Sequence, residues 1–330
     1  MKYRRLGKSG LMISELVLGT MNFGGPTGNV ESFKMIDAAL DAGINLFDCA
    51  DVYAEGESER ILGDAFARNG KREDVFITSK VFMRTGDRPN DAGNSKHHIL
   101  AACESSLKRL KTDYIDIYFL HRTDFNVAQE ETLSALDLLV RQGKVRHIGC
   151  STHPPWKVVE AHWLADKHHY PKFTSEQPPY NLLDRRAELE IIPMCLSYDL
   201  GIICWSPLAQ GVLAGRYQDA TQIPPGSRGA FKKVYGERIT QQGIDVARRL
   251  AEKAGAKGCT LPQLALSWVL HQPGVTGAII GPRTLDHFKD LLEAKDVSLN
   301  ASELAFCDEL VPPGTHVSDH FNSAGWRKEG

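Results

Sequence analysis

The chain has 330 residues, 42% of them hydrophobic, and a formal net charge of −2 at pH 7, so it can bury a large core but lacks the basic character of proteins that bind nucleic acids or anionic membranes. No run approaches the roughly 20 apolar residues of a membrane span, and the basic residues 1–10 are not followed by the apolar stretch of a secretory signal. The seven cysteines are odd in number and form no CxxC pair, which favours reduced thiols in a cytoplasmic protein over a disulfide framework or a metal site.

Two short β-like runs flank Gly7 and Ser9-Gly10 and predict an N-terminal hairpin. After it, short apolar runs alternate with longer amphipathic stretches along almost the whole chain. Several of the short runs are continuously hydrophobic or β-branched, as expected of strands that are buried on both faces of a parallel sheet. The eight predicted strands are Glu15–Thr20, Asn45–Ala50, Val75–Val81, Ile115–His121, Val145–Ser151, Phe173–Gln177, Ile202–Ser206 and Gly277–Gly281.

Helical patterns separate these strands. In Ile99–Leu110 the apolar residues recur every three to four positions, and residues 133–140 repeat this pattern. The segment from Thr260 to Gln263 has the sequence of a capping box with a proline in the first turn, which predicts the start of a helix. We expect glycines to end several helices, namely Gly43, Gly70, Gly143 and Gly201.

Eight strand–helix units without a break in composition predict one domain over residues 1–330. The expected fold is an α/β (β/α)8 TIM barrel with the N-terminal β-hairpin as a plug at its bottom. A doubly wound open sheet is the alternative, but it would normally carry GxGxxG after its first strand, and the sequence has no such match. Two long segments, residues 83–95 and 209–240, follow the third and seventh strands. Both therefore leave the carboxyl ends of strands, where the active sites of barrels lie.

Four polar residues stand at or near three successive strand ends. Asp48 ends the second strand, Tyr53 follows five residues later, and Lys80 and His121 end the third and fourth strands. A barrel gathers strand ends at one mouth, so these side chains should converge. Reduction of a carbonyl by hydride transfer leaves an alkoxide that needs a proton, and a tyrosine can supply it when a nearby ammonium lowers the phenol pKa. We expect Asp48 to keep Lys80 charged and His121 to hydrogen-bond the substrate oxygen.

Each of these residues alone has a simpler explanation. A tyrosine after a strand is usually structural, and a lysine at a strand end often reaches solvent from the rim. A lone aspartate often caps the next helix, and a lone histidine is more often a packing residue. The combination at three successive strand ends favours catalysis.

Longer motifs carry a resemblance that extends over nearly the whole chain. In chain order they are YRRLGKSGLMISELVLGTMNFGG, NLFDCADVYAEGESERILGDAF, ITSK, LHR, VRHIGCST, SEQPPYN, WSPLAQGVLAGR and AIIGPRT. With these motifs the sequence resembles the aldo-keto reductase superfamily. The resemblance implies a catalytic tetrad of Asp48, Tyr53, Lys80 and His121. It also implies NADPH-dependent reduction of an aldehyde or ketone to an alcohol, with Tyr53 as the proton donor.

The resemblance further implies that NADPH lies extended across the barrel mouth. A helix N-terminus and arginines would favour its phosphates. The implied contacts are Gly19, Thr20, Met21 and Asp48 near the first two strand ends, Ser151 and Gln177 at the carboxamide, Trp205 stacked on the nicotinamide ring, Ser206, Pro207, Leu208 and Gln210 at the pyrophosphate, Arg216 and Arg228 as a phosphate clamp, and Gly281, Arg283 and His287 around the 2′-phosphate.

Some positions depart from the family's pattern. Thr152 stands where relatives often have asparagine, and Met21 stands where many have a tryptophan that lines the substrate pocket. His287 and Leu291 replace the glutamine and asparagine common in the 2′-phosphate segment. Arg283 and Arg228 nevertheless favour NADPH over NADH.

Three other functions stay open from the sequence. Potassium-channel β subunits share the fold and resemble the chain in WSPLA and PPGSR, although they typically have asparagine in place of His121. A Schiff-base aldolase would need a neutral Lys80, which Asp48 disfavours. A metal-dependent barrel hydrolase is disfavoured because no HxH ends the first strand.

The expected partner is a small-molecule carbonyl compound, with no nucleic acid, membrane or metal involved. The oligomeric state stays open. Sugars, polyketides, aldehydes and xenobiotics are all compatible with the mixed apolar and aromatic wall that is predicted for the substrate pocket. The predicted wall residues are Phe23, Met83, Phe125 and Trp326.

Overall fold

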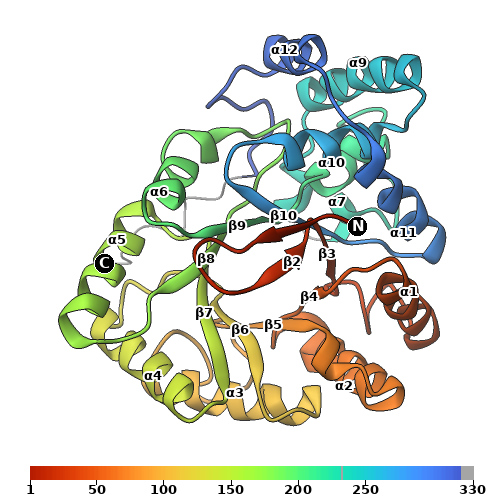
Figure 1. Ribbon diagram of the computed structural model, residues 1–330. Helices are drawn as coiled ribbons and strands as arrows, with labels where there is room; N and C mark the ends of the chain where they lie inside the picture. Colours follow the sequence, from red (N-terminus) through yellow and green to blue (C-terminus); the bar gives the residue numbers. More distant parts are fainter. Residues whose placement is uncertain (232, 321–330) are drawn as a thin grey trace.

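A closed barrel of eight parallel strands forms the centre of the computed structural model, which describes residues 1–231 and 233–320 (Figure 1). Neighbouring strands pair in the order β10-β3-β4-β5-β6-β7-β8-β9, and β10 closes the ring against β3. The predicted TIM barrel is confirmed. Its strands are β3 Leu16–Gly19, β4 Leu46–Asp48, β5 Phe76–Val81, β6 Ile115–Leu120, β7 Val145–Ser151, β8 Phe173–Gln177, β9 Gly201–Cys204 and β10 Val275–Ile280.

Helices follow the strands and surround the barrel (Figure 1). Two of them begin with capping boxes, at Thr260–Gln263 as predicted and at Asn300–Glu303, because side chain and backbone satisfy each other's free groups there. In the described part of the chain, no helix has the length and apolar character needed to cross a membrane. The α-helices are α1 Asn29–Asp41, α2 Glu57–Asn69, α3 Lys96–Leu110, α4 Gln129–Arg141, α5 Pro155–His168, α6 Ile191–Ser197, α7 Arg228–Phe231, α8 Lys233–Gly236, α9 Gln241–Lys257, α10 Leu261–His271, α11 Leu285–Leu292 and α12 Ala301–Leu310. The 3-10 helices are η1 Tyr53–Gly56, η2 Arg72–Asp74, η3 Arg186–Glu188, η4 Ala209–Ala214 and η5 Glu293–Asp296.

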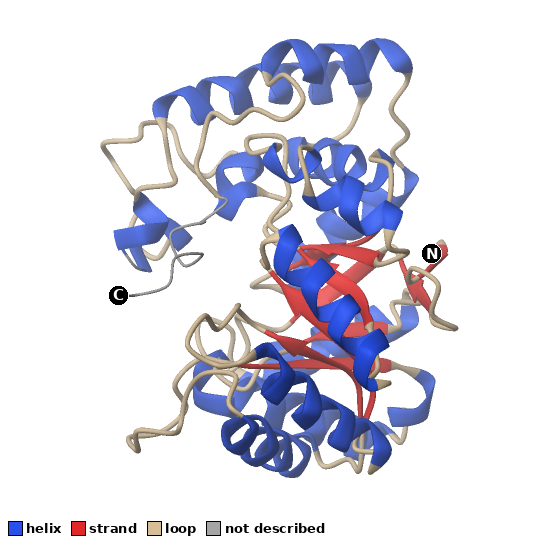
Figure 2. Cartoon of the chain, turned by 90° about the vertical axis from the view of Figure 1, so that its left-hand side faces the viewer, coloured by secondary structure: helices blue, strands red, loops and turns tan. Residues whose placement is uncertain are grey.

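The predicted hairpin consists of the antiparallel strands β1, Tyr3–Arg5, and β2, Met12–Ser14. Its residues Leu6 and Ile13 are fully buried and pack with barrel residues such as Val17 and Phe119. The hairpin turn lies so close to the backbone of residues 199–201 that Gly7, at φ +55°, has no room for a side chain. Figure 2 shows the hairpin at one end of the barrel, which it closes as predicted.

One predicted helix end is wrong. Gly201 does not close α6 but begins β9, where the absence of a Cβ lets Leu6 of the hairpin pack against its backbone. Asp199, at φ +60°, takes the left-handed position after α6 instead. The other three glycines have positive φ after their helices, as predicted: Gly43, Gly70 and Gly143.

Both long segments leave the carboxyl ends of barrel strands. Residues 83–95, after β5, form no helix or strand. Residues 209–240, after β9, contain the short elements η4, α7 and α8. Figure 2 shows loops and short helices gathered at the end of the barrel opposite the hairpin. Any site at this mouth is therefore built from loops on a rigid frame.

Candidate active site

Strand register brings three polar side chains together inside the barrel mouth. Asp48, the last residue of β4, pairs with Thr78 of β5. Side chains alternate along a strand, so Lys80, two residues beyond Thr78, points to the same face. The Thr78 hydroxyl donates to Asp48 Oδ1 at 2.7 Å, and Lys80 Nζ lies 2.8 and 2.7 Å from the two carboxylate oxygens.

Lys80 is the enclosed centre of this cluster. Its side chain is 2% exposed, and Nζ also donates to the Cys49 carbonyl at 2.7 Å and to the Tyr53 hydroxyl at 3.3 Å. Burial alone would lower the pKa of the ammonium, but Asp48 and Tyr53 outweigh burial, and the pKa of Lys80 is raised. The lysine is a fixed positive charge, which argues against the neutral nucleophile of a Schiff-base aldolase.

The pKa of Tyr53 departs from the sequence-based expectation. Burial raises this pKa above its usual value near 10, and the charge of Lys80 opposes the rise without cancelling it. The lowering by Lys80 is present, but the net shift is upward. Tyr53 is therefore protonated at neutral pH, as a proton donor must be.

Tyr53 begins a strained turn, η1. The three residues that follow it, Ala54, Glu55 and Gly56, all have positive φ, which costs about 1–2 kcal/mol for each residue with a Cβ. Arg109 of α3 lies against Gly56, where an added Cβ would come within 2.7 Å of the Arg109 Cδ. Strain of this kind persists only where surrounding contacts fix it, and such places are often functional sites.

The first turn of α2 anchors this segment through Glu59, whose side chain is completely buried. Its carboxylate accepts from Ser79 Oγ at 2.5 Å and from Arg109 Nε at 2.6 Å. Nearby, Asp51 has two buried carboxylate oxygens without a partner in the described part of the chain. Burial, and then the charge of Glu59, raise the pKa of Asp51 to about 8. The sequence analysis did not identify Glu59 and Asp51 as supports of the site, because nothing in the local sequence distinguishes them from ordinary structural positions.

His121 directly follows β6 and lies edge-on to Tyr53, with ring centroids 6.0 Å apart. Its Nδ1 is buried and has no hydrogen-bond partner among the described residues. Burial, and then the charges of Lys80 and Arg122, hold the pKa of His121 well below 6.5. The imidazole is neutral at neutral pH and can donate one N–H to an oxygen in the mouth.

The ends of β7, β8 and β9 add amide, hydroxyl and indole groups. Gln177 donates its amide N–H to Asp48 Oδ1 at 2.8 Å, and Ser151 donates its hydroxyl to the Gln177 carbonyl at 3.0 Å. Trp205 donates its indole N–H to the Thr152 hydroxyl at 3.2 Å. Thr152 has a φ of +54°, which is unusual for a β-branched residue. Gln177 and Ser151, predicted to bind the carboxamide of the cofactor, therefore lie next to Asp48 and Lys80. Trp205, predicted to stack on the nicotinamide, lies at the same end of the barrel.

The backbone after Trp205 has a shape suited to an anion. Ser206, Ala209 and Gln210 have positive φ, and Gly211 follows at φ +99°. Left-handed residues in a turn can aim successive N–H groups into one concavity, which binds phosphate. This turn coincides with the predicted pyrophosphate positions.

Arg216, Arg228 and Arg283 form a group that we call the cationic cluster. His287 adjoins it as a neutral ring, because burial and then the charge of Arg216 lower its pKa below 6.5. Arg216 Nη2 lies 3.3 Å from the His287 ring nitrogens, Arg228 Nη2 lies 2.6 Å from the Met21 sulfur, and Arg283 donates to a backbone carbonyl of the long loop. Burial, followed by the charges of Arg216 and Arg228, lowers the pKa of Arg283. Within the described ranges, no carboxylate forms an ion pair with these arginines. The cluster therefore favours an anionic ligand.

Other predicted site residues contribute less surface to the mouth. The Thr20 side chain is fully buried and bonded within the core. Phe23 is completely buried in the hydrophobic core, so its prediction as a wall residue was wrong. Met83 and Phe125 are partly exposed, and Trp326 lies outside the described residues. The remaining positions lie at strand ends or in the turn before η4: Gly19, Pro207, Leu208 and Gly281.

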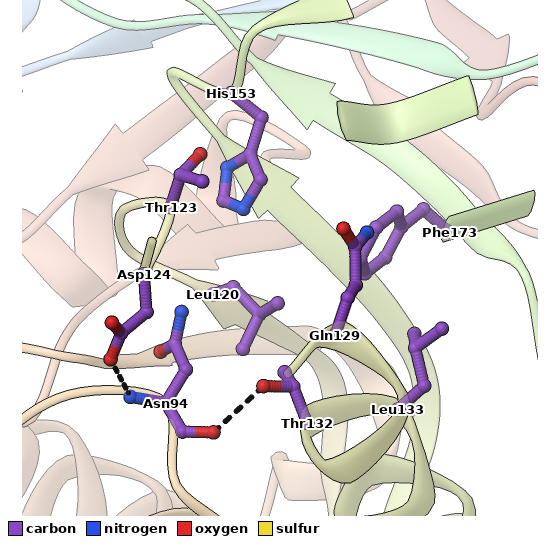
Figure 3. Close-up of a pocket in the computed structure, with 9 residues that line it drawn as sticks. All are labelled: Asn94, Leu120, Thr123, Asp124, Gln129, Thr132, Leu133, His153 and Phe173. Atoms are coloured by element: carbon purple, nitrogen blue, oxygen red, sulfur yellow. Dashed lines mark hydrogen bonds between the residues drawn. The ribbon is translucent and has the colours of Figure 1, made fainter. Parts of the chain in front are cut away.

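A small cavity lies apart from this mouth, between β6, β8 and α4 (Figure 3). Its volume is about 20 Å³, which is the size of one water molecule. The lining includes Asn94, Gln129 and His153 but no member of the tetrad. It is therefore too small and wrongly placed to hold the substrate.

Cys150, His153 and Glu176 form a buried cluster in which one donor atom from each residue lies within 4.8 Å of the others. The His153 backbone N–H donates to Glu176 Oε1 at 3.2 Å. Burial raises the pKa of Glu176 to about 8 and raises the pKa of the Cys150 thiol well above 9. Both groups are neutral at pH 7 in this state, so a metal could bind here only with the release of their protons. We assign no metal to this cluster.

Comparison with known proteins places the chain in a family. Residues 15–312 match the model of the aldo/keto reductase family. The chain is 38% identical over 335 residues to the uncharacterized oxidoreductase YrpG of Bacillus subtilis, covering 97% of this chain and 99% of that protein. It is 36% identical over 303 residues to a probable voltage-gated potassium channel subunit beta of Oryza sativa, covering 90% and 92%. It is 32% identical over 344 residues to versiconal hemiacetal acetate reductase of Aspergillus parasiticus, covering 97% and 100%.

Proposed function

The chain belongs to the aldo/keto reductase family and is a nicotinamide-dependent oxidoreductase for small carbonyl compounds, and on this premise we propose that it uses NADPH to reduce an aldehyde or ketone to the alcohol. Tyr53 is the proton donor. The observation that carries the proposal is the continuous contact from Asp48 through the Lys80 ammonium to the Tyr53 hydroxyl. A neutral His121 beside this hydroxyl completes the group.

The residues at the mouth fit a dinucleotide with several phosphates. The three arginines of the cationic cluster form no ion pair with a described carboxylate, so an anion would relieve their mutual repulsion. The turn at residues 206–211 offers backbone N–H groups to the pyrophosphate. We attribute the preference for NADPH over NADH to Arg283, which stands just before α11 and forms no ion pair with a described carboxylate.

Each residue of the mouth has its own role in the proposed reaction. Ser151, Gln177 and Trp205 would hold the nicotinamide, which when bound would supply a hydride for the carbonyl carbon. Tyr53 Oη donates its proton to the carbonyl oxygen while negative charge develops there, and His121 donates a hydrogen bond to the same oxygen. Lys80, kept charged by Asp48, stabilises the phenolate that remains. Solvent returns a proton to Tyr53, so one carbonyl, one NADPH and one proton give one alcohol and one NADP⁺.

Turnover with a panel of uncharged and charged aldehydes and ketones tests this function. NADPH oxidation is followed by absorbance, and the alcohol is identified by chromatography. We expect repeated turnover of several aldehydes, with NADPH preferred to NADH. Absence of turnover across the whole panel, with cofactor binding intact, would contradict the proposal.

Similarity to proteins named potassium channel β subunits favours a second candidate, a cofactor-binding subunit of a channel. Such a subunit need not release product repeatedly. The same assay separates the two candidates, because a subunit would bind NADPH without sustained alcohol formation.

A cytoplasmic location is part of this proposal. All seven cysteines are free thiols, and six of them are buried. Reduced cysteines are typical of cytosolic proteins. Fractionation of the native cells, with immunodetection of the enzyme, tests the location.

A further inference from the structure

Arg122, the residue after His121, carries a positive charge to the same mouth. Its guanidinium donates to the Thr152 hydroxyl at 2.8 Å and to the His121 carbonyl at 3.1 Å, and both acceptors are neutral. The guanidinium carbon also lies over the Trp205 ring, 5.8 Å from its centroid. The side chain thus borders both the tetrad and the indole that is proposed to stack on the nicotinamide.

The charge of Arg122 is not balanced by the neighbours that the structure describes. Among the described residues no carboxylate forms an ion pair with it, and the acid that influences it, Glu176, is protonated at neutral pH. Partial burial lowers the pKa of Arg122, and the charge of the buried Arg238 lowers it further. The two carboxylates that influence Arg238 are already ion-paired with Arg186.

An arginine keeps its proton in proteins, so this charge cannot be removed by titration. A half-buried guanidinium without an acidic partner is costly, and a carboxylate relieves this cost best because it accepts two parallel N–H bonds. The phosphates of the cofactor have the separate cationic cluster, which comes from the segment 209–240 and from the segment just before α11. Neither the described carboxylates nor the cofactor phosphates are left to pair with Arg122, which fits an anion brought by another molecule in the mouth.

We propose that the substrate is an aldehyde or ketone that carries a carboxylate, and that Arg122 holds this carboxylate while the carbonyl oxygen meets Tyr53 and His121. Arg238 adds a second positive charge on the same side. This inference rests on the proposed carbonyl reduction. The redox step is unchanged: the hydride goes to the carbonyl carbon, the Tyr53 proton goes to the oxygen, and the carboxylate stays intact.

Matched substrate pairs test the inference. The ortho, meta and para isomers of carboxybenzaldehyde are compared with their methyl esters, and succinic semialdehyde is compared with butanal, all with saturating NADPH. The readout is the ratio of kcat/KM for the acid to kcat/KM for its uncharged partner. We expect at least one pair to favour the acid by about tenfold or more, the effect of one charge-assisted hydrogen bond.

Three variants locate the effect. Arg122→Met should bring the ratio of the favoured pair close to one, whereas Arg122→Lys, which keeps the charge, should retain part of the preference. Arg141→Met, which removes an exposed arginine of α4 that pairs with Asp137, should keep the wild-type ratio. NADPH titration and thermal unfolding confirm that each variant is folded.

The outcomes separate the inference from the function on which it rests. If wild type reduces acids and uncharged partners equally well in every pair, the inference is overturned and the proposed reduction stands. If Arg122→Met lowers both members of a pair by the same factor, Arg122 supports the cofactor or the barrel, and the inference is likewise overturned. If no compound of either kind is reduced, the proposed function itself fails.

Discussion

The ammonium nitrogen of Lys80 lies 3.3 Å from the hydroxyl oxygen of Tyr53. Because the Lys80 side chain is enclosed and held by both oxygens of Asp48, its charge cannot move away from the phenol. This charge is the main influence that opposes the effect of burial on the pKa of Tyr53. The proton transfer that we propose depends on this contact.

Lys80→Met should therefore change the pH dependence of the residual activity. Alcohol oxidation requires the Tyr53 phenolate, so its rate rises with pH toward the pKa of Tyr53, which lies above 10. Removal of the charge that lowers this pKa moves the rise to higher pH and reduces oxidation at a fixed pH by about tenfold or more. Stopped-flow oxidation across the pH range measures the shift. Lys108→Met, at an exposed position of α3, is the control, and an unchanged profile in Lys80→Met would show that another group tunes the tyrosine.

Arg283→Ala should separate the two nicotinamide cofactors. A charge-assisted hydrogen bond contributes roughly 1.5–3 kcal/mol, and only NADPH carries the 2′-phosphate. We expect NADPH affinity to fall by about tenfold or more while NADH affinity stays nearly constant. Fluorescence titration with both cofactors measures this, with Trp205 as the expected quenched residue. Equal weakening of both cofactors would make Arg283 a structural residue.

Glu176→Gln should change how stability depends on pH. Burial raises the folded-state pKa of Glu176 to about 8, above the value of about 4.3 in an unfolded chain. Its contribution to stability is therefore complete below about pH 4 and is lost as the pH rises toward 8, by up to about 1.4 kcal/mol per pH unit. Glutamine keeps an acceptor oxygen for the His153 N–H but cannot ionise. Urea unfolding at about pH 5 and about pH 8 measures the free energy of unfolding of both proteins. The value for the variant, relative to wild type, should be higher at about pH 8 than at about pH 5. If the free energies of unfolding of variant and wild type changed equally with pH, Glu176 would be ionised in the folded protein.

The barrel could be predicted because its determinants are local. Buried parallel strands appear as continuous apolar runs, and the helices between them keep a three-to-four-residue spacing. Convergence of Asp48, Lys80 and His121 followed from topology alone, since all three stand at strand ends. The structure then supplied the contact between Asp48 and Lys80 that this topology implied.

Features that depend on distant segments could not be predicted. Gly201 is a packing position for the hairpin rather than a helix cap, and this depends on Leu6. The net pKa shift of Tyr53 depends on the degree of burial, which no motif reveals. The unbalanced charge of Arg122 became visible only when the structure described its neighbours.

Single-turnover reduction by Tyr53→Phe is the most direct test of the proposed mechanism. The substitution removes one oxygen and changes little volume, so NADPH should bind as in wild type, and a titration of both proteins establishes this. The enzyme with NADPH bound is then mixed with an aldehyde that wild type reduces, and the rate of NADPH oxidation is recorded. Loss of the general acid should lower this rate by about 10²–10⁴-fold. A variant that retained half of the wild-type rate would show that Tyr53 is not the proton donor.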